Sequence, residues 1–428
     1  MESFVGRECD VKHTLISVVA FRQTAGKTGK MKNKLILEVS TMKVKSLFLG
    51  SAAAVALSSG AMAADPIGVA LDTCSLLNIT GLTVSSESNC LKFSGEVSYD
   101  WDWDLDAETT TSEFGWEFTM EATADSDFGP AKAVVTLIDE SGTSTSSDVD
   151  IDEAYVAIGD QTVIMAGQKG SVAKDGDDET FTALFDLDGR DGNDEGIDLG
   201  GGQGGHVIQV TSDLGNGVDV ALGLEDLSTN DNASLVAGLG VDQDWGTAHV
   251  GMVFDDIIDP GTNDWFLHAG ATINVDDMSF RGAFSTDDAG EWAIMVAGKA
   301  TFDMFTLAAG VEFFEDDHST TLGGPDADTD VEWEAAVSGE AAVNDAVTIT
   351  VAGRWDDNDE WDVAAQGVFA VSDNLDLTAK VNFDEANVTT FNADLDWAPG
   401  GGFEAGVGVE IDSNSNSALS ASFSKAFE

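Results

Sequence analysis

The residues best suited to act on a passing ion are carboxylates gathered between residues 170 and 204. This segment carries ten Asp and Glu residues, with Lys174 and Arg190 as its basic residues. Carboxylates that face basic side chains across a narrow opening focus the electric field where an ion sheds water. The acidic residues expected to form such a constriction are Asp175, Asp177, Asp178, Glu179, Asp186 and Asp188. The alternative is an acidic loop that only faces solvent.

Part of the same segment loosely resembles the beginning of a calcium-binding loop. The spacing of its first ligands is matched by Asp191, Asn193, Glu195 and Gly196. Gly202, however, stands where the final Glu of such a loop is required. The sequence therefore leaves open whether calcium binds among the acidic loops, and it assigns no site for it. No other cofactor is expected.

The sequence gives little support for an enzyme or for a nucleic-acid-binding protein. The histidines downstream of residue 63 are His206, His249, His268 and His318. They lie apart in the sequence without a Ser-centred motif, which disfavours an enzyme. Residues 26–28 end like a phosphate-binding loop, but Phe21 occupies the position of its first Gly. A net charge of −59, from 19 basic and 78 acidic residues, opposes binding to nucleic acid, whose phosphates require Lys and Arg.

The N-terminal region has the pattern of an export leader. From Met42, two lysines precede an apolar run over residues 47–57 and a small-residue cleavage site at residues 61–63. We therefore expect residues 42–63 to be a cleaved signal peptide. Residues 1–41 are expected to be an upstream extension from a start codon assigned too early.

Two cysteines remain after the expected cleavage. Export places a chain where disulfides persist, and a pair of cysteines is too few for a metal site. A bridge between Cys74 and Cys90 is therefore expected within an N-terminal segment that spans residues 64–90.

From residue 91 to residue 428, apolar and polar residues alternate with a period of two. In residues 375–384, for example, every second residue is apolar. This period describes a β-strand with one apolar face, and runs of about ten residues match tilted strands that cross a bilayer. Tight turns such as residues 214–217 alternate with longer loops such as residues 316–330, as in an up-and-down antiparallel transmembrane barrel. Counting the runs gives five strands before residue 170 and fifteen after residue 205.

The sparse basic residues fall on the polar faces of these expected strands. A charge on the lipid face costs about 2–4 kcal/mol at mid-membrane, so a barrel directs charges to its lumen. The basic residues expected to line a pore are Lys92, Lys132, Arg281, Lys299, Arg354 and Lys380. A soluble β-sandwich would show a similar alternation. The number of runs and the aromatic residues near their ends favour an all-β transmembrane barrel.

Two stretches resemble the alphaproteobacterial general-diffusion porin family. One is the leader VKSLFLGSAAAVALSSGAMAAD, and the other is the spacing from Cys74 through Gly81 to residues 90–95 and Tyr99. The resemblance implies a homotrimeric outer-membrane barrel with an inward-folded constriction loop, here residues 170–204. Members of the family commonly have sixteen strands, so an even number in the range 16–20 is expected.

The leading hypothesis is an integral outer-membrane porin. It would form a water-filled pore for ions and small hydrophilic solutes, surrounded by outer-membrane lipid and lipopolysaccharide. The excess of acidic residues predicts a preference for cations. The alternative is a secreted or surface β-rich protein that binds its partner in a calcium-dependent way.

Overall fold

The computed structural model describes residues 73–139, 149–174, 179–185, 187, 204–228, 233–258, 264–315 and 331–428. These residues belong to one compact unit that spans Leu71–Glu428. The expected leader and upstream extension lie outside the described residues, and they stay predictions.

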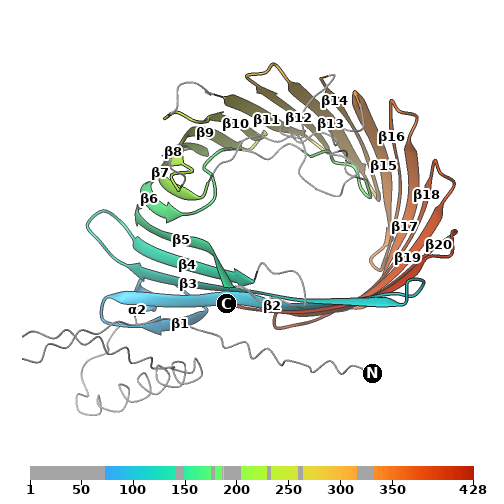
Figure 1. Cartoon of the computed structure of the whole chain (residues 1–428), viewed down its shortest axis with the longest axis horizontal. Coiled ribbons are helices and arrows are strands. Elements are labelled where there is room, and N and C mark those ends of the chain that lie inside the picture. Colours follow the sequence, from blue (N-terminus) through green and yellow to red (C-terminus); the bar gives the residue numbers. More distant parts are fainter. Residues whose placement is uncertain are drawn as a thin grey trace, which may run out of the picture. The chain divides into compact units, whose positions relative to one another are not determined.

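Nearly all of the described chain is β-structure, arranged as a ring of antiparallel strands (Figure 1). A one-turn helix, α2, spans Thr73–Leu76, and a short strand, β1, spans Leu82–Ser85. Within the described ranges, the ring consists of twenty strands: β2 (Asn89–Asp104), β3 (Thr109–Ala124), β4 (Ala131–Asp139), β5 (Val149–Gly159), β6 (Thr162–Gln168), β7 (His206–Gly215), β8 (Val218–Glu225), β9 (Ser234–Gln243), β10 (Gly246–Phe254), β11 (Trp265–Val275), β12 (Met278–Asp287), β13 (Trp292–Phe302), β14 (Phe305–Phe314), β15 (Trp333–Asn344), β16 (Val347–Asp356), β17 (Trp361–Ser372), β18 (Leu375–Asp384), β19 (Thr389–Gly400), β20 (Phe403–Asp412) and β21 (Ser417–Phe427).

The ring closes because its first and last strands pair with each other. β2 pairs with β21 from Gly95 opposite Phe427 to Asp104 opposite Ala418, and every other strand of the ring pairs with the next along the chain. Closure leaves no unpaired edge, which a strand surrounded by lipid cannot tolerate. The predicted transmembrane barrel with an even strand number is confirmed. Five strands of the described ring precede residue 170 and fifteen follow residue 205.

Alternate residues of each strand face opposite sides of the wall. On β13, the side chain of Val296 is 55% exposed, whereas its neighbour Met295 is fully buried in an interior cluster. The exposed row continues on neighbouring strands with Phe280 and Leu307, which are apolar as the hydrocarbon of a bilayer requires. The predicted outward placement of the apolar rows follows from this alternation.

The connections at the two ends of the barrel differ in length. Tight turns join β7 to β8, β11 to β12 and β13 to β14, and they contain Asn216, Asp276 and Asp303 with φ of 55°, 52° and 53°. Asn and Asp tolerate this left-handed conformation, which two-residue hairpins require. The opposite end carries longer connections, including those from β6 to β7 and from β14 to β15. The predicted alternation of tight turns and longer loops is confirmed.

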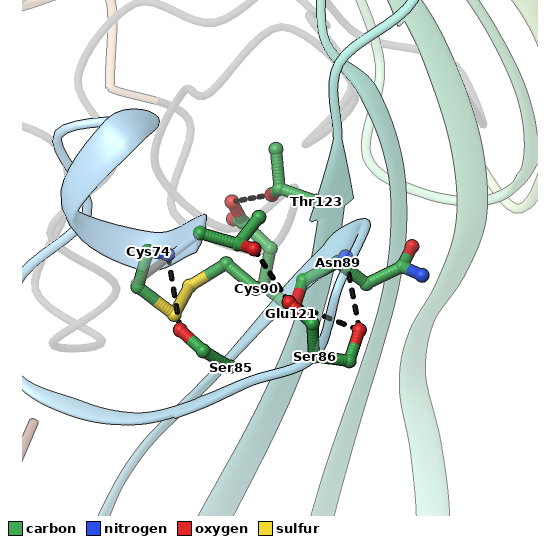
Figure 2. The surroundings of a disulfide bond; sticks show 8 residues. Cys74, Ser85, Ser86, Asn89, Cys90, Glu121 and Thr123 are labelled. Atoms are coloured by element: carbon green, nitrogen blue, oxygen red, sulfur yellow. Dashed lines mark hydrogen bonds between the residues drawn. A yellow bond between two sulfur atoms is a disulfide. The ribbon is translucent and has the colours of Figure 1, made fainter. Parts of the chain in front are cut away.

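A small N-terminal substructure extends the sheet beside the closing strands. β1 pairs with the first residues of β2, and Cys74 in α2 forms a disulfide with Cys90 in β2, as predicted (Figure 2). The Cys74 N–H also donates a hydrogen bond to Ser85 Oγ at 3.1 Å. Both cysteines are buried, so the bridge fixes α2 and β1 against β2. None of the helices within the described ranges has the length and apolar character needed to cross a membrane.

Candidate functional site

The described parts of the chain between β6 and β7, residues 169–174, 179–185 and 187, follow the inner wall of the ring (Figure 1). Val172 packs in a cluster with residues of β8 to β11, Phe181 with residues of β12 to β14, and Phe185 with residues of β16 and β17. We call residues 179–185 the inner segment. It covers one side of the inner wall and therefore narrows the space inside the ring.

The base of this insertion is fixed by Glu225, at the end of β8. Its Oε1 accepts hydrogen bonds from Val172 N–H at 2.9 Å and from Gln209 Nε2 at 2.8 Å. Its Oε2 accepts a third from Gly204 N–H at 2.8 Å. Val172 follows β6 and Gly204 precedes β7, so one fully buried carboxylate holds both ends of the insertion. Sequence reasoning did not find Glu225, because its only visible signal is a polar-face position at the end of a strand.

Small residues on the inner wall make room for the inner segment. Phe181 packs against Ala283, Ala293 and Ala297, which are nearly fully buried beneath it. A Cβ placed on Gly310 would lie 2.5 Å from Thr180 Cγ2, closer than real contacts allow. Small side chains at these four positions therefore let the segment lie close to the wall, and Met295 and Phe314 complete the cluster.

The C-terminal half of the inner segment is fixed by hydrogen bonds as well as by packing. Ala183 N–H donates to Ser338 Oγ on β15 at 3.0 Å. The Thr182 hydroxyl donates to the backbone oxygen of Phe185 at 2.9 Å, closing a turn in which Leu184 has a φ of 73°. This turn directs Phe185 into a cluster with Ala352 and Ala364.

Four of the six basic residues predicted to line a pore contact the rings of the inner segment. Arg281 and Lys299 lie over the Phe181 ring, at 4.5 and 4.6 Å from its centroid. Arg354 and Lys380 lie over the Phe185 ring, at 5.3 and 5.7 Å. These cations therefore lie on the same side of the lumen as the inner segment, and not across the opening from it.

The other two predicted basic residues lie near the closing strands. Lys132 on β4 forms an ion pair with Glu121 on β3 at 3.0 Å. Lys92 on β2 approaches Glu428 at 3.9 Å. Both sit on inner-face positions far around the ring from the inner segment, so the six residues form two separate groups.

Of the predicted constriction carboxylates, Glu179 is the one described. Its backbone oxygen accepts a hydrogen bond from Arg281 Nη1 at 2.9 Å. The remaining predicted residues lie outside the described ranges and stay predictions: Asp175, Asp177, Asp178, Asp186 and Asp188.

The inner wall from β18 around to β3, which begins beside the inner segment and continues away from it, is acidic. Lys380 reaches Phe185 inside the ring, so its strand face is an inner face. Residues that lie opposite each other on paired strands share a face, so the inner face can be followed from β18 to β2. Lys380 lies opposite Asn392, Asn392 opposite Glu410, Glu410 opposite Ala418, and Ala418 opposite Asp104. Apart from Glu121, which pairs with Lys132, the carboxylates on this face from β18 to β3 form what we call the acidic arc: Glu96, Asp100, Asp102, Asp104, Glu113, Glu117, Asp376, Asp384, Asp394, Asp396, Glu404, Glu410 and Asp412.

Two of the histidines that are scattered in the sequence meet in the structure. The rings of His249 on β10 and His268 on β11 stack with centroids 4.8 Å apart, on the inner face and well buried. His268 Nδ1 shares a hydrogen bond with Ser285 Oγ at 2.8 Å. His318 lies outside the described residues.

The chain is similar to curated proteins named Porin Omp2b. It is 25% identical over 319 residues to Porin Omp2b of Brucella neotomae, a match covering 61% of this chain and 84% of that protein. The match to Porin Omp2b of Brucella suis biovar 1 (strain 1330) is 25% identical over 303 residues and covers 59% and 79%. The resemblance to alphaproteobacterial porins is confirmed by these relatives. No family model matches the chain.

Solved structures also align with 79% of this chain and 100% of their own. A triple mutant of the Rhodopseudomonas blastica porin has a TM-score of 0.40 at 11% identity. A loop-deletion mutant of OmpT, an outer membrane protein of Vibrio cholerae, has a TM-score of 0.38 at 12% identity.

Proposed function

We propose that this chain forms a water-filled pore through the bacterial outer membrane, for passive diffusion of ions and small hydrophilic solutes. The observation that carries the proposal is the closed ring, whose outer face is apolar and whose inner face is polar. An apolar exterior suits lipid, and a polar lumen lowers the barrier that a hydrated ion meets in hydrocarbon. The relatives named as porins support the same function.

Passage through such a pore needs no chemical step. Water and the polar wall replace part of the hydration shell, and the charges on the wall bias which ions enter. The role that we propose is therefore that of a channel and not of an enzyme.

We further propose that the pore prefers cations. The carboxylates of the acidic arc outnumber the four cations at Phe181 and Phe185, which keep their charge when they stack on an aromatic ring. A wall lined by one sign of charge raises the local concentration of the opposite ion. The acidic constriction predicted at residues 175–188 would act in the same direction.

We propose that the chain assembles as a homotrimer, surrounded by outer-membrane lipid and lipopolysaccharide. The support is the resemblance to alphaproteobacterial porins together with an outer face that is apolar around the ring. Cross-linking of the detergent-solubilised protein should yield a trimer, and a monomer alone would contradict this assembly.

The direct test of the pore is conductance in planar bilayers. Purified protein should produce stepwise current increases, and a salt gradient should give a reversal potential of the sign expected for cation flow. Absence of conductance from correctly folded protein would contradict the pore. Conductance with anion preference would contradict only the proposed selectivity.

Extraction from cells separates this function from that of a secreted or surface calcium-dependent binding protein. A transmembrane barrel should require detergent, and its folded form should migrate differently from the heated form on a gel. Release by salt or by a calcium chelator without detergent would favour the binding protein.

A further inference from the structure

We propose that Arg281, Lys299, Arg354 and Lys380 are positioning residues that hold the inner segment against the wall and thereby set the width of the pore. This inference rests on the proposed pore function. It assigns these cations a task different from attracting anions, which is the usual expectation for basic residues in a lumen.

The first clip consists of Phe181, Arg281 and Lys299. Arg281 on β12 and Lys299 on β13 both lie within 4.6 Å of the ring centroid. A cation within about 6 Å of an aromatic face is attracted by the negative face of the ring. Arg281 also donates from Nη1 to the backbone oxygen of Glu179, so it holds the segment at two points.

The second clip consists of Phe185, Arg354 and Lys380. Their distances to the ring are 5.3 and 5.7 Å. Arg354 is itself oriented by Asp362, whose Oδ2 accepts from its Nε at 2.8 Å, and both side chains are mostly buried. A bound and oriented guanidinium loses little further freedom when it stacks on an aromatic ring, which favours a positioning role.

The two clips together fix both ends of a short stretch. Phe181 and Phe185 are four residues apart, and Ala183 between them is bonded to Ser338. Beneath them the wall presents small residues, so displacement of either ring would leave a space and widen the free lumen. The four cations thus act on permeation through the position of the segment.

The first experiment changes the ring and leaves every charge in place. Phe181→Leu keeps an apolar side chain but removes the aromatic face, and Phe181→Tyr keeps the face. In planar bilayers, Phe181→Leu should show additional conductance levels and greater open-channel noise at an unchanged reversal potential. Phe181→Tyr should behave as the wild type. A Phe181→Leu pore with wild-type levels and noise would overturn the proposal.

The second experiment removes a charge inside and outside a clip. Lys299→Met should reproduce the noise of Phe181→Leu, and the double variant should be no noisier than either single variant, because both changes break one contact. Lys132→Met is the matched control, since Lys132 pairs with Glu121 and not with the inner segment. It also removes a positive charge from the lumen, but it should leave the open-channel noise and the number of conductance levels as in the wild type. If Lys299→Met shifts only the reversal potential, as an anion-attracting residue would, the proposal is wrong.

A third measurement does not depend on conductance. In folded, detergent-solubilised full-length protein, trypsin cleavage after Lys174, which pairs with Asp219 on β8 at 2.7 Å, reports release of the insertion. Phe181→Leu should accelerate this cleavage by about 5- to 30-fold, as expected for loss of two cation–π contacts. Lys132→Met should cleave at the wild-type rate. Equal rates in all three proteins would overturn the clips, whereas a silent wild-type channel with faster cleavage of Phe181→Leu would contradict only the pore.

Discussion

At the scale of single residues, Glu225 bonds to both ends of the insertion. Its two oxygens accept from Val172 N–H, Gly204 N–H and Gln209, and its side chain is fully buried. Hydrogen bonds to a buried carboxylate are stronger than neutral ones, and a buried N–H group left without an acceptor is costly. One side chain therefore joins both ends of the insertion, beside the backbone hydrogen bond from Lys169 N–H to the Gly205 oxygen at 2.9 Å.

Glu225→Gln should loosen that closure without unfolding the barrel. The amide keeps the size of the side chain but loses its charge, and it places a donor near two donating N–H groups. Hydrogen exchange of the Val172 and Gly204 amides should become about 10- to 100-fold faster, the factor expected for loss of a charged hydrogen bond. Glu153→Gln, which breaks the ion pair between Glu153 on β5 and Lys169 directly after β6, is the control and should leave both amides unchanged. Equal exchange in Glu225→Gln and the wild type would contradict this role.

The side of the wall on which a residue lies could be predicted from the sequence, but its partner could not. Alternation along β12 and β16 places Arg281 and Arg354 on the polar face, where the structure has them. Nothing in the local pattern shows that Phe181 and Phe185 cover that face, because these rings come from a segment about a hundred or more residues away. The partners of Glu225 and the stacking of His249 on His268 were missed for the same reason.

At the scale of secondary-structure elements, the inner segment lies close to β14 because β14 has a glycine at the contact. Gly310→Ala should therefore displace the segment, since the new Cβ would lie 2.5 Å from Thr180 Cγ2. We expect a loss of about 1–3 kcal/mol in the free energy of unfolding, typical of overpacking. Denaturant unfolding in detergent measures it.

Gly282→Ala on β12 is the matched control for that substitution. Its new Cβ would meet the backbone oxygen of Met295 at 3.5 Å, an ordinary contact, on the outer face. It should leave both the stability and the single-channel conductance unchanged. A Gly310→Ala protein as stable as Gly282→Ala would show that the segment yields without cost.

The disulfide should stabilise α2 and β1 and leave the ring largely independent of them. In a Cys74→Ser, Cys90→Ser double variant, the amides of β1 should lose protection from hydrogen exchange. The expected local loss is about 2–4 kcal/mol, typical of a short cross-linked loop. The amides of β13, far around the ring, should keep their protection. Wild-type protection of β1 would contradict a stabilising role for the bridge.

Elements of the ring could be predicted because lipid on one side and water on the other impose a strict alternation on each strand. Turn residues with positive φ, such as Asn216 and Asp303, also marked the ends of strands. β1 was not predicted, because four residues are too few for a clear period. Its place beside β2 is set by the disulfide and by pairing with residues that precede the contact with β21.

At the scale of the whole molecule, the charge of −59 should make stability depend on salt. Repulsion among the carboxylates of the acidic arc extends over about 30 Å at 0.01 M salt but only about 8 Å at 0.15 M. The temperature of the heat-induced mobility shift should therefore rise with sodium chloride over this range. A temperature independent of salt would mean that the carboxylates are neutralised by protons or by bound cations.

A barrel with more strands encloses a wider lumen. The inner segment packs on the inner wall of this twenty-stranded ring and occupies part of that lumen. Without the inner segment, the proposed pore would have a wider opening for water-soluble solutes. Its size limit would thus depend on whether the rings of Phe181 and Phe185 stay packed on the wall.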